Sequence, residues 1–498
     1  MRNKSALSGP RTRVAVLMGA ALAVAACQAA PKRPADMTKV GPFAAAVVSQ
    51  PVIDSISRAC FKGAAHAETR EYEPHAAANP ANPDQIVATW IAITDGTSQV
   101  MVATSKDGGA IWTTPAVLPV TACAGGDPGA TRAGDPWAAF GPDGRAYVGA
   151  MGLAVSGGEL SYISLVVASS TDTGRTWAAG RIAAPSEMPK FNYDNLELTA
   201  DPTRPGSVYL ATTQYQSAVP GKVAAPDDPV SFAGPAAFTR STDGGQTWTD
   251  IRAVTPLIGG GRISAPLVLV DPKTGRIHMV YFRERADTAL IGLISSTDQG
   301  DTWSAETTIA PFVKLTDYPS TTIKFGGKFG ITTAQDILQG AVDPESGRVF
   351  VAFSDARHTQ GKYLSVSLTS SADGSTWTEP MEVNPKMAAH AWLPSVAIDS
   401  AGRLAVSYLD VRTWSTDTTA EAIPTTHTLG SYPLGPDGAP GSRTDYLLDT
   451  FNLLGPRRGR GGTGDYQGLV GRRQGFASIY VKHYPAGSAK VSDLMVAR

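Results

Sequence analysis

The stretch Ser241-Thr242-Asp243-Gly244-Gly245-Gln246-Thr247-Trp248 is the most informative part of this 498-residue chain, because versions of it occur five times. The shared pattern is Ser-x-Asp-x-Gly-x-Thr-Trp, with Ile in place of Thr in the first copy and one residue fewer in the last. The copies span residues 105–112, 170–177, 241–248, 296–303 and 371–377. Their aspartates are 55 to 75 residues apart, which leaves room for a small four-stranded sheet in each unit. Repetition at this period predicts a propeller or a solenoid.

Each copy suits a tight turn between two strands. Ser and Asp side chains accept hydrogen bonds from backbone N–H groups just downstream, and Gly allows a positive φ. The Trp opens the next strand and can bury its ring between neighbouring sheets. Although Ser-x-Asp-x-Gly is similar to the start of a calcium loop, no acidic ligand recurs at the far end of a twelve-residue loop. We therefore expect the five copies to be structural.

A second repeat lies upstream of the turns and predicts a hairpin in each unit. Pro, Asp and Gly cluster between two short runs rich in Val, Ala, Tyr and Phe, which is typical of hairpins. The copies are Asn82-Pro83-Asp84 and residues 141–145, 201–206, 271–276, 343–348 and 399–403. Each unit then contains an inner strand, a hairpin, two further strands joined in sequence, the Asp-containing turn and an outer strand. This is a propeller blade, so we expect an all-β protein with a single propeller domain.

The number of blades depends on how the chain ends. Six hairpins define six blades, and residues 464–469 and 478–482 predict the inner two strands of another sheet. Residues 43–56 could supply its outer strands and so protect the edge of the ring. We expect seven blades, with six as the alternative. The propeller then covers residues 43–485, with insertions at 220–235, 314–330 and 415–462 and a C-terminal tail at 486–498.

The N-terminus indicates export. Residues 14–26 form an apolar run that is too short to span a bilayer but fits the core of a signal peptide within residues 1–27. The run ends in Val24-Ala25-Ala26-Cys27, which resembles a bacterial lipobox. That resemblance implies lipidation of Cys27 and a place in the bacterial cell envelope, with residues 28–42 as a tether. Cleavage at Ala23-Val24-Ala25, which would give a secreted protein, is the alternative.

Composition limits the remaining partners. An oxidising compartment would allow a disulfide between Cys60 and Cys123, with two buried thiols as the alternative. No Cys or His spacing suggests zinc, and we expect neither a metal nor a cofactor. The net charge of −1 and pI of about 6.7 do not point to nucleic acid. We expect membrane contact only through the lipid anchor.

Candidate site residues come from the starts of the inner strands and the ends of the second strands. These positions gather aromatic, arginine and carboxylate side chains, which can stack on sugar rings and bind a carboxylate. The set favours a carbohydrate with an anionic group and comprises Arg70, Arg132, Asp135, Trp137, Glu197, Arg262, Arg357, Trp392, Asp465 and Tyr466. For Asp355 with Arg357, and for Asp410 with Arg412, salt bridges between structural elements are an equal alternative.

The Asp-containing turns and the blade pattern, from about residue 70 to residue 485, resemble those of sialidases and related Asp-box propellers. The resemblance implies three arginines that hold a substrate carboxylate, an aspartate as acid/base, and a tyrosine nucleophile paired with a glutamate. Placed by blade order, these roles fall on Tyr466 with Glu197 and on Asp135 as acid/base. The arginines would be Arg70 or Arg132, Arg262 and Arg357, and Trp137, Trp392 and Asp465 would also contact the substrate.

These residues support one leading function and two others. The first is a secreted, surface-anchored, sialidase-like exo-glycosidase that hydrolyses terminal acidic sugars of glycans. The second is a non-catalytic propeller that binds glycans or proteins, because the Arg-Ile-Pro that supplies the family's first arginine is missing here. The third is a polysaccharide lyase on uronate polymers, with His390 and Tyr466 as its reactive pair.

Overall fold

The computed structural model describes most of the chain after residue 42. The described residues are 43–49, 54–62, 69–94, 96–188, 191–216, 234–255, 262–285, 288–316, 322–325, 329–386, 388–412, 423–453, 462–484 and 488–498. The proposed signal peptide, Cys27 and the tether lie outside them. No helix among the described residues is long and apolar enough to cross a membrane.

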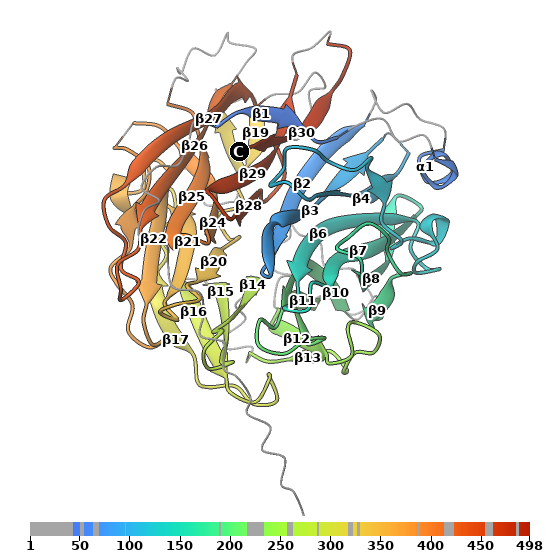
Figure 1. Cartoon of the computed structure of the whole chain (residues 1–498), viewed down its shortest axis with the longest axis horizontal. Coiled ribbons are helices and arrows are strands. Elements are labelled where there is room, and N and C mark those ends of the chain that lie inside the picture. Colours follow the sequence, from blue (N-terminus) through green and yellow to red (C-terminus); the bar gives the residue numbers. More distant parts are fainter. Residues whose placement is uncertain are drawn as a thin grey trace, which may run out of the picture.

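Seven four-stranded antiparallel sheets follow one another around a common axis, so the protein is a seven-bladed β-propeller (Figure 1). Blade one consists of β2 (Arg70–Asn79), β3 (Asn82–Ile93), β4 (Ser98–Ser105) and β5 (Ala116–Val117). Blade two consists of β6 (Arg132–Phe140), β7 (Ala146–Ser156), β8 (Glu159–Ser170) and β9 (Arg181–Ala184). Blade three consists of β10 (Phe191–Ala200), β11 (Val208–Gln216), β12 (Ala236–Ser241) and β13 (Arg252–Ala253). Blade four consists of β14 (Arg262–Val270), β15 (Ile277–Glu284), β16 (Ala289–Ser296) and β17 (Thr307–Pro311). Blade five consists of β20 (Gln339–Val342), β21 (Val349–Asp355), β22 (Ser365–Ser371) and β23 (Met381–Glu382). Blade six consists of β24 (Ala391–Ile398), β25 (Arg403–Asp410), β26 (Pro424–Pro433) and β27 (Thr444–Asn452). The expectation of seven blades is confirmed.

The seventh blade joins the two ends of the chain. Its strand order is β28 (Gly468–Gly471), β29 (Phe476–His483), β30 (Ser492–Ala497) and β1 (Ala45–Val47). The blue strand β1 lies beside the red strand β30 in Figure 1, and Ala46 faces Val496 in the ladder. The N-terminal segment thus supplies the outer strand of this blade.

Three features differ from the sequence-based expectations. Residues 486–498 are not only a tail, because β30 is the third strand of the last blade. The expected insertion at 415–462 contains β26 and β27, the two outer strands of blade six. Blade six lacks the Ser-x-Asp turn that indicates the outer strand in blades one to five. The insertion at 314–330 contributes to a separate hairpin of β18 (Thr322–Phe325) and β19 (Phe329–Thr332).

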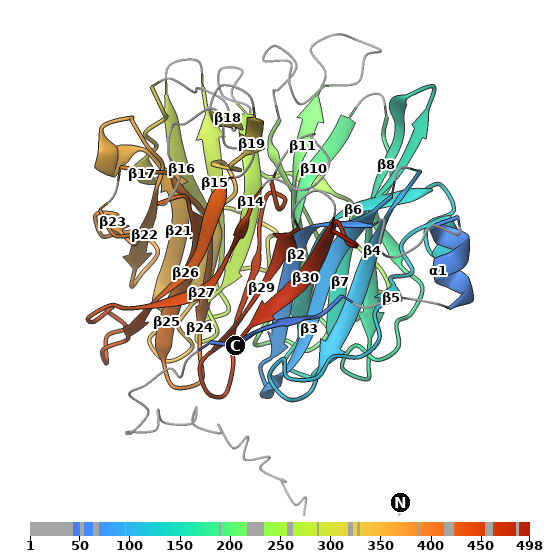
Figure 2. The same cartoon turned by 90° about the horizontal axis from the view of Figure 1, so that it is seen from above.

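Helix is confined to short segments among the described residues. These are α1 (Ser55–Cys60) and two 3-10 turns, η2 (Ala122–Ala124) and η3 (Arg357–Thr359). Asp54 caps α1 by accepting a hydrogen bond from the Ser57 amide at 2.6 Å. Figure 2 shows α1 at the right-hand rim of the propeller, near β4 and β5.

The five Asp-containing turns share one hydrogen-bond pattern. In the copy at 241–248, the Ser241 hydroxyl accepts from the Gly245 amide at 2.9 Å, and Asp243 accepts from the amides of Gln246 and Thr247. Gly245 has φ of 82°, which a side chain would oppose. The hydrogen bonds from Thr247 lower the pKa of Asp243 to about 2. These turns connect the third and outer strands of blades one to five, as the sequence predicts.

Removal of the N-terminal closure should destabilise the propeller. A chain that starts at residue 59 lacks β1, so the backbone edge of β30 is left unpaired. We expect a lower thermal midpoint and more light scattering than for a chain that starts at residue 42. A shorter chain that melts at the same temperature as the longer one and stays monomeric would show that β1 is dispensable.

Candidate functional site

The inner strands share an irregularity near their first residues. In blades one to four and six, a β-bulge interrupts the pairing with the second strand. A residue other than glycine adopts a positive φ within each bulge, namely Glu73 (51°), Asp135 (49°), Asn195 (55°), Ala265 (46°) and Leu393 (58°). Such backbone costs about 1–3 kcal/mol per residue and is concentrated at functional sites in proteins. The bulges therefore mark one end of the propeller axis as the candidate site.

Four half-buried carboxyl groups gather there from different blades. Asp135 of blade two lies close enough to Glu73 of blade one and Asp194 of blade three to raise the pKa of each. Asp465, which precedes β28 of blade seven, lies close enough to raise the pKa values of Glu73 and Asp135. The bulges bring these side chains together because each one turns the start of its strand in the same way.

The surroundings of these carboxyl groups change their pKa values. Burial, and then the neighbouring charges of Asp135 and Asp465, raises the pKa of Glu73 well above its ordinary value. Burial and the charge of Asp135 raise the pKa of Asp194 to about 8. Burial and then the charge of Asp465 raise the pKa of Asp135 to about 6. Burial and the neighbouring charges thus raise the pKa of all three carboxyl groups.

An aromatic group lies beside this cluster. The rings of His75 and Trp137 stack at 3.9 Å between centroids, and Tyr466 meets Trp137 edge-on at 5.2 Å. The Tyr466 hydroxyl donates to the carbonyl of Pro136 at 3.1 Å, and the Ala138 amide donates to His75 at 3.1 Å. Burial lowers the pKa of His75 to about 3, so its ring is neutral.

The predicted nucleophile and its partner have unusual surroundings. Tyr466 is 5% exposed, and burial followed by the charges of Glu73 and Asp135 raises the pKa of its hydroxyl well above the ordinary value. Glu197 is 2% exposed, and neither of its carboxylate oxygens has a hydrogen-bond partner within the described part of the chain. Its charge also acts on Tyr466. The structure thus brings Tyr466 near Asp135 and Glu197, and their catalytic roles stay predictions.

The four predicted arginines are held by different parts of the protein. Arg262 contacts Glu284 at 3.1 Å and Asp336 at 2.9 Å, and it also acts on Asp194. Arg132 contacts the carbonyl of Gly96 at 3.5 Å, and Arg70 lies close enough to Tyr72 for its charge to act on that hydroxyl.

Arg357 belongs to an ion pair. It contacts Asp355 at 2.8 Å and donates to the carbonyl of Pro311 at 2.6 Å. Arg412 pairs in the same way with Asp410. Both ion pairs join residues that lie two positions apart in the chain.

Two other predicted residues, Trp392 and His390, come from the start of the inner strand of blade six. Trp392 is 1% exposed and belongs to the hydrophobic core. His390 accepts a hydrogen bond from the Leu364 amide at 3.1 Å and packs against Tyr363, whereas Tyr466 packs against Trp137. The histidine that contacts Tyr466 is His75, with 6.3 Å between ring centroids.

Glu73, His75, Asp194 and Asp336 also belong to the polar residues expected at the starts of the inner strands, but no individual catalytic or binding role was predicted for them. A signal for part of this set exists, because Glu73-Pro74 and Asp135-Pro136 place an acid before proline at equivalent positions of successive blades. Asp194 precedes Asn195-Leu196 instead, so the pattern stops before it reaches blade three.

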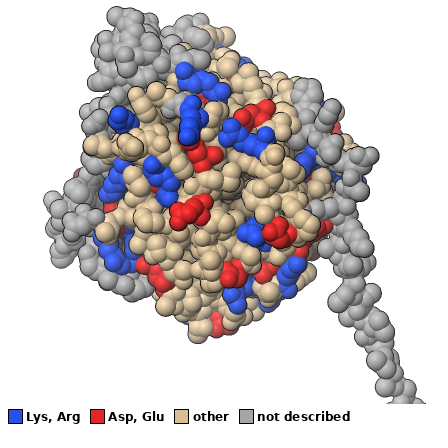
Figure 3. Space-filling view, turned by 90° about the vertical axis from the view of Figure 1, so that its left-hand side faces the viewer, with Lys and Arg blue, Asp and Glu red and all other residues tan. Residues whose placement is uncertain are grey.

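The cluster contrasts with the outer surface in its charge. On the face of the molecule shown in Figure 3, acidic and basic side chains are interspersed. Around the axis, carboxyl groups predominate. Among the main influences on the pKa of Asp194, Arg262 is the one cation. Within the described ranges, no group of three or more His, Cys, Asp or Glu side chains is arranged to hold a metal ion.

The fold and the site define an Asp-box propeller with a carboxyl cluster at one end of its axis. The chain belongs to the BNR repeat-like domain family, whose model matches residues 84–406. No curated protein matches the sequence.

Solved structures share the fold at low sequence identity. A protein of unknown function from Dyadobacter fermentans has 15% identity and a TM-score of 0.47, with 91% of this chain and 96% of that chain covered. The Hadza microbial sialidase Hz136 has 16% identity and a TM-score of 0.47, with 82% and 73% covered. An α-L-arabinanase from Penicillium chrysogenum, solved with arabinobiose, has 14% identity and a TM-score of 0.42, with 76% and 93% covered. Similarity at this level does not assign an activity.

The carboxyl cluster should make the fold less stable at alkaline pH. The pKa of Asp194 is about 8 in the fold and near 4 when unfolded, so its contribution to stability is complete below pH 4 and is lost as the pH rises through 8. We expect Asp194→Asn to raise the thermal midpoint by about 2–4 °C at pH 8 and by little at pH 4. The matched control is Asp250→Asn, at an exposed position. Equal effects of Asp194→Asn at both pH values would contradict the raised pKa.

Proposed function

We propose that the protein is a glycoside hydrolase whose reaction is carried by the carboxyl cluster. The observation that supports this most directly is the meeting of Glu73, Asp135 and Asp194 from the bulges of three blades, where burial raises the pKa of each carboxyl group. Glycoside hydrolysis needs a protonated carboxylic acid and an ionised carboxylate at the same bond, and protein surroundings separate their pKa values.

The reaction can be written with carboxyl groups alone. Asp194 gives its proton to the leaving glycosidic oxygen as the bond from that oxygen to the anomeric carbon breaks. Water forms the new bond to the anomeric carbon and gives a proton to a carboxylate on the opposite face of the sugar, about 6.5–9.5 Å from the acid. Burial and the charge of Asp135 raise the pKa of Asp194 to about 8, which favours its protonated form. Trp137 and Tyr466 hold the bulge of blade two in place through the Pro136 carbonyl and the ring contact.

The charge of the site bears on the class of sugar. A carboxylate on the substrate would meet the carboxyl groups of Glu73, Asp135, Asp194 and Asp465, whereas the nearby Arg262 is already bound to Glu284 and Asp336. We therefore propose that the ring nearest the cluster is uncharged. The terminal acidic sugars expected from the sequence are the competing class, and the same assay distinguishes the two.

A panel of fluorogenic glycosides tests the proposal. The panel contains neutral pyranosides and furanosides, an α-sialoside and a glucuronide. We expect turnover of a neutral member, with a kcat/KM profile that falls near pH 8 as Asp194 loses its proton. Asp194→Asn should lower kcat by about 100-fold or more.

The exposed Glu159→Gln on β8 is the control and should keep wild-type rates. Turnover of the α-sialoside alone would favour the acidic-sugar class. Binding of glycans without any product from the panel would favour the non-catalytic propeller. An unsaturated, ultraviolet-absorbing product from a uronate polymer would favour the lyase.

We also propose that the protein is exported and anchored by a lipid on Cys27. The lipobox-like Val24-Ala25-Ala26-Cys27 supports the anchor, and the disulfide between Cys60 and Cys123 fits an oxidising compartment. The tether at 28–42 ends just before β1, so the anchor would be attached at the seventh blade.

Metabolic labelling with an alkyne fatty acid tests the anchor. We expect the wild-type chain, expressed in a bacterium, to carry the label and to fractionate with membranes, and Cys27→Ser to do neither. Cys60→Ser should keep the label. A mature N-terminus after Ala25 without label would instead support a secreted protein.

A further inference from the structure

The N-terminal segment does more than complete the last blade. Its described parts, residues 43–49 and 54–62, are referred to below as the strap. The first part pairs with β30, since the Val48 amide donates to the Leu494 carbonyl at 2.7 Å. Ser49 continues this contact, because its hydroxyl donates to Asp493 at 3.2 Å and accepts from the Leu494 amide at 2.9 Å. The second part contains α1.

The strap belongs to the apolar contact between blades seven and one. Val48, Cys60 and Phe61 of the strap are buried in one hydrophobic cluster with residues of both blades. Blade one contributes Ile86, Trp90, Met101 and Val117 among others, and blade seven contributes Val470, Ile479, Leu494 and Val496. The strap thus covers the junction between the first and last blades.

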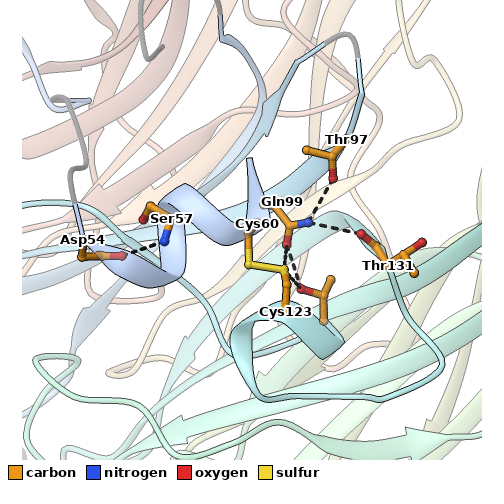
Figure 4. The surroundings of a disulfide bond; sticks show 8 residues. Asp54, Ser57, Cys60, Thr97, Gln99, Cys123 and Thr131 are labelled. Atoms are coloured by element: carbon orange, nitrogen blue, oxygen red, sulfur yellow. Dashed lines mark hydrogen bonds between the residues drawn. A yellow bond between two sulfur atoms is a disulfide. The ribbon is translucent and has the colours of Figure 1, made fainter. Parts of the chain in front are cut away.

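A disulfide fixes the far end of the strap (Figure 4). Cys60, the last residue of α1, is bonded to Cys123 in η2, which follows β5 of blade one. A hydrogen-bond network centred on the buried Gln99 holds η2. Thr121 donates to Gln99 at 2.8 Å, and Gln99 donates to Thr97 at 3.1 Å and to the Thr131 carbonyl at 3.3 Å.

The same junction runs through the carboxyl cluster. The Glu73 amide of blade one donates to the Thr463 carbonyl of blade seven at 3.1 Å. A Cβ atom on Gly464 would lie 2.5 Å from the Glu73 nitrogen, so the two segments touch directly. Asp465 and Tyr466 follow at once. A small separation of the two blades would therefore move Asp465 and Tyr466 away from Glu73.

A further contact across the junction is polar and buried. The Glu71 amide donates to the Ser492 hydroxyl at 2.8 Å, and that hydroxyl donates to the Glu71 carboxyl group. Thr69 also donates to Glu71, at 3.2 Å. Water could replace these contacts if the blades separated, so apolar packing and the covalent attachment of the strap must supply the closing force.

We propose that the strap is a redox-dependent clamp on the site, in which the Cys60–Cys123 disulfide locks blade seven against blade one. Every other junction in the ring is crossed by the chain from an outer strand to the next inner strand. At this junction α1 of the strap lies between β1 of blade seven and β2 of blade one in the chain, and the disulfide attaches α1 to η2. Without the bond, the first part of the strap keeps its contacts with β30, but no covalent link ties α1 to blade one at η2. The dependence of activity on the clamp rests on the proposed function, but the opening of the junction does not.

The locking step is a thiol–disulfide exchange. The thiols of Cys60 and Cys123 lose two electrons and two protons, and the disulfide of a thiol–disulfide oxidoreductase accepts them and becomes a dithiol. The consequence is that the site is assembled only after the chain reaches an oxidising compartment.

Hydrogen exchange of the full-length folded protein, with and without tris(2-carboxyethyl)phosphine, tests the clamp. We expect reduction to lower the protection of peptides covering β1, β30, residues 69–76 and residues 462–471 by about tenfold or more. Peptides from blade four, β14–β17, should change by less than about twofold. With reductant, kcat on the neutral glycoside should fall along with the loss of protection.

The double variant Cys60→Ser/Cys123→Ser is the matched control. It should resemble the reduced protein and show no further response to the reductant. Because the variant could fail to fold during export, reduction of the folded wild-type protein is the deciding measurement.

Three outcomes would overturn the clamp. These are unchanged protection on reduction, an equal loss in all blades, and an opened junction with undiminished turnover. A different result separates the two proposals. If reduction causes the local loss of protection but neither the oxidised nor the reduced protein hydrolyses a glycoside, the proposed function is refuted and the clamp stays supported.

Discussion

The ladder between β1 and β30 is the contact on which the rest of the structure depends. A propeller blade buries its faces against two neighbours, so a ring with one open junction leaves two apolar faces and a backbone edge exposed. Here the closing blade takes three strands from the C-terminal end of the chain and one from the N-terminal end. The carboxyl cluster lies across the same junction, so fold closure and site assembly rest on the same contacts.

The sequence predicted the repeating parts of the fold because their chemistry is local. A turn such as Ser241–Trp248 is determined by hydrogen bonds within a few residues, and it therefore leaves a readable pattern. Blade six has no such turn, and its outer strands β26 and β27 were taken as part of an insertion. Strand β30 was also missed, because residues 492–497 become a strand through pairing with β29 and β1, and nothing within the segment itself shows it.

The site was harder to predict than the fold for a related reason. The sequence shows that polar residues begin the inner strands, and it identified Asp135, Asp465 and Tyr466 among them. It does not show which partners are already engaged: Arg262 is bound by two carboxylates, Arg357 by Asp355, and Trp392 lies in the core. Nor does it show that Glu73 and Asp194 reach Asp135, because this depends on bulges in three different blades. The resulting centre is rich in carboxyl groups, where a family resemblance led us to expect arginines.

The left-handed backbone at Asp135 also limits how this position can change over evolutionary time. Asparagine, aspartate and glycine tolerate that conformation better than other residues, and branched side chains tolerate it worst. Aspartate and asparagine are a single nucleotide apart in the genetic code. A lineage under no selection for catalysis could therefore exchange the carboxylate for an amide while the bulge, the blade and the ring stay intact. Propellers that bind without reacting can arise from ancestors of this kind by one small step, and the reverse step is equally short.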